Sequence, residues 1–173
     1  MTRRALSIVI ATVLLPALPL LGATSVQALQ APVAFTSAAL STWQTNGVAW
    51  TVAQAQGKVF VGGTFKKIRP SGAAAGTNEQ ARANFAVFDA ATGAPTSCAP
   101  SFTQSSDPSG AGASVRALDV SPDGRTLYVG GYFSTVNGSA LQHLAALDIA
   151  SCTVVSAFKP LPNGSVRAID STS

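Results

Sequence analysis

A short motif that occurs twice constrains this sequence more than any other feature. Residues 59–65 (VFVGGTF) return as residues 127–133 (LYVGGYF), and each copy is an apolar run that ends in a glycine pair and then an aromatic residue. The first glycines stand at positions 62 and 130, a separation of 68, and the flanking sequence repeats with them. Self-similarity of this kind indicates a fold assembled from copies of one supersecondary unit. The residues that define the motif are Gly62, Gly63 and Phe65 in the first copy and Gly130, Gly131 and Phe133 in the second.

Short apolar segments separated by turn residues fill both repeats, which predicts strands. In the first repeat we expect strands at 48–52, 58–65 and 84–89, a loop at 69–81 and a short fourth strand within 97–102. In the second repeat the expected strands are 115–120, 127–133, 144–148 and 153–158.

A hairpin turn is expected after the first strand of the second repeat, at Ser121-Pro122-Asp123-Gly124. Its proline sets φ and Gly124 accepts a positive φ. Residues 166–170 nearly copy 115–119 and restart the pattern. We therefore expect 166–170 to be a first strand as well.

Apolar residues at consecutive positions predict that the sheets stack face to face. Residues 85–88 and 127–129 leave no face for water, whereas a sheet with one wet face alternates. A β-sandwich also buries both faces of some strands, but it does not require a repeating sequence. We therefore expect an all-β fold of propeller-like blades, each of four antiparallel strands. Blade 1 would span about 48–102 and blade 2 about 115–158, with 166–173 starting a third, so that the propeller is incomplete.

The first 28 residues have the three parts of a secretory signal peptide. Residues 1–4 contain two arginines, residues 5–21 are almost wholly apolar, and Val26 and Ala28 are small residues at the −3 and −1 positions of a cleavage site. A transmembrane anchor is the alternative, but the run is marginal for the ~20 residues that a span needs and prolines interrupt it. The export route stays open, because the resemblance to a twin-arginine signal is faint.

Cleavage after Ala28 divides the chain into a signal peptide at 1–28, a lead-in segment at 29–47 and the repeat region at 48–173. The expected location is therefore extracellular, with no membrane attachment after cleavage. Only nine basic residues then face seven acidic ones, since Arg3 and Arg4 are among the 11 of the full chain. This balance gives no indication of nucleic-acid binding.

The repeats resemble the delta-60 repeat β-propeller family of secreted bacterial proteins. The resemblance rests on residues 129–138 (VGGYFSTVNG) with 144–148 (LAALD), and on 61–65 (VGGTF) with 85–89 (FAVFD). It covers Val48 to Asp170, nearly all of the mature chain. The family implies a propeller fold and carries no established catalytic residues, so none is transferred. Its members are often parts of longer exported proteins beside adhesive or sugar-binding modules.

Residues suited to catalysis or metal binding are scarce. His143 is the only histidine and falls where the first repeat has Asn84, which favours a structural role. The aspartates that end strands, at 89, 119, 148 and 170, are expected to cap turns. Asp119 and Asp123 are too few for a calcium site, which takes six to eight oxygens. We therefore predict no catalytic, cofactor-binding or metal-binding residue.

Two arginines recur at one position of the repeat. Arg116 and Arg167 match, and Ala49 is their counterpart in the first repeat. They would line a central channel or pair with neighbouring aspartates. Trp43, Trp50 and Tyr132 could stack on sugar rings, although aromatic residues inside blade motifs are commonly part of the core.

Cys98 and Cys152 are the only cysteines, and both lie in the exported part. Oxidising surroundings and an even count permit one disulfide between them. Two buried free thiols are the alternative, because the two positions are not equivalent in the repeat.

Two classes of function fit these observations. The first is a secreted, non-catalytic repeat module for extracellular binding or scaffolding, with a glycan, a protein or a cell-wall component as its partner. The second is part of a secreted propeller enzyme, a hydrolase or dehydrogenase, whose active site lies in other blades. The scarcity of acid–base groups favours the first. Because only two blades are visible, we expect a fragment of a longer protein whose further blades lie in the same or another chain.

Overall fold

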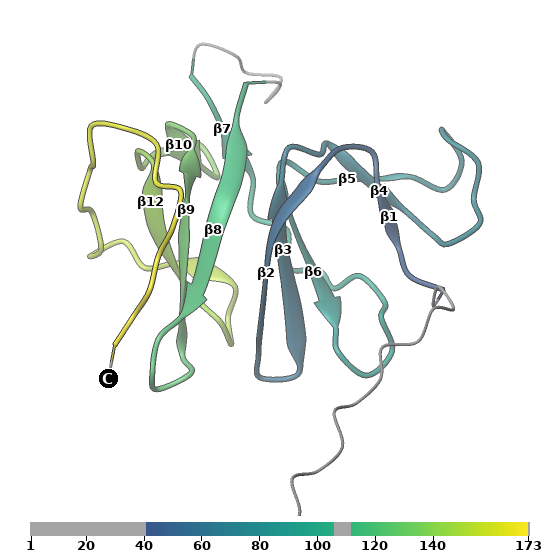
Figure 1. Cartoon of the computed structure of the whole chain (residues 1–173), viewed down its shortest axis with the longest axis horizontal. Helices are drawn as coiled ribbons and strands as arrows, with labels where there is room; N and C mark the ends of the chain where they lie inside the picture. Colours follow the sequence, from purple (N-terminus) through teal and green to yellow (C-terminus); the bar gives the residue numbers. More distant parts are fainter. Residues whose placement is uncertain (1–40, 106–111, 173) are drawn as a thin grey trace, which may run out of the picture. The chain divides into compact units, whose positions relative to one another are not determined.

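The computed structural model describes residues 41–105 and 112–172, and in these two ranges the chain is all-β, without helices (Figure 1). The strands form four antiparallel sheets, two large and two small. The prediction of an all-β chain is confirmed. The predicted signal peptide and most of the lead-in segment lie outside the described residues.

The two large sheets are built alike. Large sheet 1 has the order β2-β3-β6, formed by Ala49–Ala55, Lys58–Gly63 and Phe85–Asp89. Large sheet 2 has the order β13-β12-β9-β8, in which β8 is Ser114–Val120, β9 is Thr126–Tyr132, β12 is Leu144–Asp148 and β13 is Thr153–Val154. In both, the strand that carries the glycine pair is central and pairs with the first strand on one side.

The fourth strands are shorter than the sequence predicts. In large sheet 1 the fourth position is a single bridge between Phe88 and Pro95. The segment 97–102 is not that strand, because its last residue belongs to another sheet. In large sheet 2 the predicted strand 153–158 is reduced to two residues, and a turn follows directly.

Two small sheets were not predicted. One has the order β1-β4-β5, formed by Gln44–Thr45, Lys67–Arg69 and Gln80–Ala81. The other has the order β11-β10-β7, formed by Ser139–Ala140, Thr135–Val136 and Phe102–Thr103. The end of the predicted lead-in is therefore paired in a sheet, and the predicted loop at 69–81 ends in a strand.

The hairpin turns explain why the first two strands of each repeat pair. Gln56 and Gly57 both have positive φ and join β2 to β3 through two residues. The longer turn from β8 to β9 has Gly124 at φ 70°, with its N–H donated to the carbonyl of Ser121 at 2.8 Å. Asp123 accepts hydrogen bonds from the Ser121 hydroxyl and the Arg125 N–H, which fixes the turn.

The second glycine of each pair faces a bulge in the neighbouring strand. A β-bulge lies between Ala49 and Thr51 in β2, and another between Val115 and Ala117 in β8. The bulge brings the backbone of the first strand so close that a Cβ at Gly63 would meet the Val48 carbonyl oxygen. At Gly131 a Cβ would meet the carbonyl oxygen of Ser114 in the same way. Only glycine fits such an approach.

The first glycine of each pair receives a side chain from the next unit along the chain. A Cβ at Gly62 would meet Cγ1 of Val115, which lies in β8. A Cβ at Gly130 would lie 2.6 Å from Cγ1 of Val166. The two contacts are equivalent, so residues after 163 relate to large sheet 2 as β8 relates to large sheet 1.

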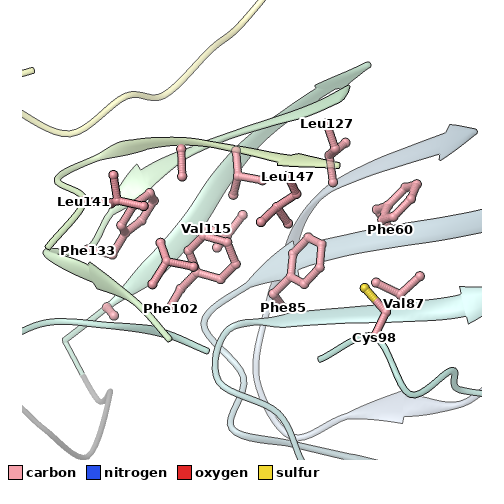
Figure 2. Packing of buried hydrophobic residues seen from close by; sticks show 14 of the residues in the cluster. Phe60, Phe85, Val87, Cys98, Phe102, Val115, Leu127, Phe133, Leu141 and Leu147 are labelled. Atoms are coloured by element: carbon pink, nitrogen blue, oxygen red, sulfur yellow. The ribbon is translucent and has the colours of Figure 1, made fainter. Parts of the chain in front are cut away.

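The main hydrophobic core lies between the two large sheets. Phe60, Phe85 and Val87 come from large sheet 1, and Val115 and Leu127 from large sheet 2; Figure 2 shows these side chains directed into one cluster. The rings of Phe60, Phe85, Phe102 and Phe133 follow one another at centroid distances of 6.3, 5.4 and 5.0 Å. Burying such rings supplies much of the hydrophobic stabilisation in a core.

Burial on both faces is found in β6 but not in β2. Phe85 and Val87 face the main core, while Ala86 packs against a second cluster with Phe65 and Ile68. The prediction for this strand is confirmed. In β2, by contrast, Val52 is 63 % exposed.

A disulfide joins Cys98 to Cys152, with their Cα atoms 5.6 Å apart. Cys98 follows large sheet 1, and Cys152 lies in the turn between β12 and β13 of large sheet 2. The bond therefore fastens the first repeat to the second.

Residues 166–170 do not form the predicted strand. The segment lies against large sheet 2, where the Val166 N–H donates to the Gly131 carbonyl at 3.2 Å and the Ser171 N–H donates to Asp119 at 2.7 Å. Two such bonds position the chain, but a ladder requires regular pairing. Asp119 thus accepts from this segment and does not cap its own turn.

Candidate ligand-binding site

The bulges bring three repeat-equivalent side chains together. Trp50 is the bulged residue of β2 and Arg116 is the bulged residue of β8, since each lies between the two residues that pair across the bulge. Arg167 follows Val166 as Arg116 follows Val115, and both valines cover a first glycine. The first-repeat counterpart of the arginines is therefore Trp50, and the predicted counterpart Ala49 is wrong. The turn after β8 is longer than the turn after β2, so positions before the two turns do not match at the separation of the glycine pairs.

Trp50, Arg116 and Arg167 line one open depression of about 150 Å³. The Arg116 guanidinium carbon lies 5.5 Å from the centroid of the Trp50 ring, a cation–π arrangement. The Arg116 Nε–H donates to the Ser114 hydroxyl at 3.0 Å. Trp50 is 52 % exposed, so much of its ring is open to solvent. We call these three side chains the Trp–Arg cluster.

The Trp–Arg cluster is positively charged and has no acidic partner within the described residues. The one ion pair found in this part of the chain joins Lys67 to Glu79, in the small sheet that contains β4. Arg116 and Arg167 take part in no ion pair there, and no carboxylate lines the depression. Two guanidinium groups without a counter-ion attract anions.

A second depression, of about 310 Å³, contains an arginine that is engaged in the fold. It is lined in part by Lys66, Arg82 and Ser101. Arg82 donates to the carbonyls of Ala81 and Thr96 and to the side chain of Gln80. Burial lowers the pKa of its guanidinium, and its Nε is buried without a hydrogen-bond partner. Arg82 therefore holds the segment before β6 in place.

A third depression, of about 390 Å³, lies beside the disulfide. Its cation, Lys58, donates through Nζ to the Ile149 carbonyl at 2.6 Å and to the Ala150 carbonyl at 3.3 Å. Lys58 belongs to β3 and its acceptors to the turn after β12. The contact ties the two large sheets together and leaves this amine occupied.

His143 takes the position in the second repeat that Asn84 has in the first, as the sequence comparison predicts. His143 and Asn84 both have a positive φ, of 61° and 68°. The backbone carbonyl of each accepts a hydrogen bond from the N–H of the second glycine in its own repeat. The imidazole stacks on Tyr132 at a centroid distance of 5.6 Å.

Three aspartates cap turns. Asp89 accepts from the N–H groups of Ala91 and Thr92, and Asp148 accepts from the N–H and hydroxyl of Ser151. Hydrogen bonds from these serine, threonine and backbone groups lower the pKa of Asp89 and Asp148, and the Ser121 hydroxyl does the same for Asp123. In the described part of the chain, no three potential metal ligands come together.

Comparison of the chain with protein-family models, with curated proteins and with solved structures found no match. Across 41–105 and 112–172, no helix is long and apolar enough to cross a membrane. The chemistry of the Trp–Arg cluster therefore has to be inferred from its own three side chains. The sequence singled out all three residues separately, but only the bulge register brings the tryptophan to the arginines.

Proposed function

We propose that this protein is a secreted module of β-propeller-like repeats that binds an extracellular glycan, protein or cell-wall component without catalysing a reaction on it. In this proposal each large sheet is a blade. Support comes from the two equivalent valine–glycine contacts, because stacking by one repeated contact is how blades surround an axis. The first strands β2 and β8, which lie side by side in Figure 1, would then be the inner strands.

The Trp–Arg cluster is the observation that carries the binding function. Trp50 is half-exposed beside two guanidinium groups that form no ion pair within the described residues, an arrangement that a ligand would complete. Its position on the first strands would place it at the axis of the assembly. Ligands commonly bind where repeated units present side chains to a shared surface.

Binding of the exported protein to soluble extracellular polysaccharides and cell-wall fractions tests the proposal. We expect saturable binding that Trp50→Ala weakens. Tyr132→Ala is the matched control, since Tyr132 is also exposed but lies outside the cluster. Binding that only Tyr132→Ala weakens would refute the site. Turnover of a bound ligand would refute the non-catalytic function and support the hydrolase or dehydrogenase alternative.

Export is tested separately by N-terminal sequencing of protein recovered outside the cell. We expect the mature chain to begin at Leu29, because Val26 and Ala28 fit the cleavage site. A product that still begins at Met1 would refute the proposed cleavage.

A further inference from the structure

We propose that the ligand of the Trp–Arg cluster is an acidic saccharide, one that carries carboxylate or sulfate groups on its sugar rings. The inference rests on the proposed binding function and names its ligand class. It follows from the orientation of Arg116, the charge of the depression and the open face of Trp50.

Arg116 is held in one orientation by two contacts. Its guanidinium lies over the Trp50 ring, and its Nε–H is donated to Ser114. The terminal Nη groups have no hydrogen-bond partner within the described residues, so their donors are free for a ligand. A guanidinium that is fixed in this way has already lost the conformational freedom that binding would otherwise cost. Its planar fork matches the two oxygens of a carboxylate or sulfate.

Arg167 adds a second positive charge to the same depression. Its side chain is exposed, and it forms no ion pair or hydrogen bond within the described residues. Two guanidinium groups from successive repeats suit a ligand whose own charges repeat along a chain. A polymer of acidic sugar units has that property.

Trp50 selects a saccharide over an acidic peptide. One side of its ring faces the Arg116 guanidinium, and about half of the residue remains exposed. Sugar rings present flat C–H faces that pack on an aromatic ring, and a depression of about 150 Å³ is no larger than a single such unit needs. An acidic peptide would use the arginines and gain little from the exposed tryptophan.

The test compares polygalacturonate and heparin with dextran and poly-glutamate, using titration calorimetry on the exported protein. We expect polygalacturonate or heparin to bind, more weakly as salt is added, because salt screens exposed charges. Dextran should not bind, since it is neutral, and poly-glutamate should bind at least about tenfold more weakly. Polygalacturonate carries carboxylates alone, whereas heparin carries both carboxylates and sulfates, so binding of heparin without binding of polygalacturonate would indicate that sulfate is required.

Substitutions assign the binding to the cluster. Arg116→Gln and Arg167→Gln should each weaken binding of the acidic saccharide about tenfold or more, because each removes charge-assisted hydrogen bonds. Trp50→Ala should weaken it as well. Arg125→Gln is the charge-matched control, since Arg125 is exposed in the β8–β9 turn, and it should have no effect. Thermal melts of every variant show whether the fold is retained.

The outcomes separate this inference from the proposed function. Equal binding of poly-glutamate, or binding that Trp50→Ala leaves unchanged, would overturn the saccharide class. If dextran or another neutral glycan binds and only Trp50→Ala weakens it, the acidic class is overturned while the binding function stands. If no polysaccharide binds, the inference is overturned, whatever ligand the module takes. A melting temperature unchanged in Arg116→Gln, together with lost binding, would support it.

Discussion

Large sheets 1 and 2 share strand order, bulge position and glycine pair, yet their first strands differ in burial. Val115 in β8 is fully buried, whereas its counterpart Ala49 in β2 is exposed and Val52 of the same strand is 63 % exposed. β8 has a neighbour on each side, β2 on one and residues 166–171 on the other. β2 pairs with β3 in its own sheet and packs against β8 of the next one. Local sequence therefore sets the strand and its bulge, while the neighbouring unit sets how deeply the strand is buried.

The disulfide is the strongest link between the two regions, so its removal should have the largest effect. The double variant Cys98→Ser, Cys152→Ser should lose about 4 kcal/mol of unfolding free energy, because a bridge that closes 54 residues restricts the unfolded chain. Denaturant unfolding followed by fluorescence measures the loss. Adding reductant to the double variant is the control and should change nothing. Two alkylatable thiols in the native, non-reduced protein would contradict the bond.

The first glycines allow a direct test of the difference between a fixed neighbour and a movable one. Gly62→Ala would press on Val115, which is held in β8 and in the core, and should cost about 2 to 3 kcal/mol through overpacking. Gly130→Ala would press on Val166 and Ile169, in a segment held by few hydrogen bonds, and should cost about 1 kcal/mol.

Unfolding of both alanine variants in parallel measures the difference. Gly57→Ala is a poor control because Gly57 has a positive φ; Gly164→Ala is better, since a Cβ there meets nothing within 4 Å. Equal losses at Gly62 and Gly130 would mean that residues 166–171 are held as firmly as β8.

The turn aspartates give the smallest effect and a dependence on pH. Hydrogen bonds lower the pKa of Asp89 and Asp148 in the folded state, so their carboxylates stabilise the fold above the unfolded pKa of roughly 3.9. That stability is lost as pH falls through the lower folded-state values. Asp89→Asn and Asp148→Asn should therefore lower the melting temperature at neutral pH and leave it nearly unchanged in strong acid. A difference from the unmodified protein that persists undiminished in strong acid would show that the carboxylate charge is not its cause.

Much of the fold could be predicted because the glycine pairs mark the central strand of each large sheet. Each pair accommodates a bulge in one neighbouring strand and a close contact with a side chain of the next unit, so the motif carries information about three segments at once. The turns at Gly57 and Gly124 could also be predicted from glycine, because a positive φ favours that residue. The small sheets were not predictable in this way. Their strands have two or three residues, too few to show a period.

The Trp–Arg cluster could not be predicted from the sequence, for a different reason. The turn between β8 and β9 is longer than the turn between β2 and β3, so a fixed spacing from the glycine pair does not identify equivalent positions. Trp50 and Arg116 differ in chemistry, which hides their equivalence further. The third strand at 166–170 was predicted from similarity to 115–119, but a strand also requires a paired neighbour, and these residues have only isolated bonds.

The valine–glycine contact has a direction. Each unit offers a glycine to the next unit and a side chain to the one before it, so units joined by this contact run head to tail. Such a contact is heterologous, because a surface at one end of the unit meets a different surface at the other end. Repeated head-to-tail joining closes into a ring or extends into a helix, according to the rotation at each step. In the first repeat Ala49 takes the position of the valine. Because alanine is smaller than valine, a contact that β2 makes with the glycine of a preceding unit would be less tightly packed than the other two and the easiest to open.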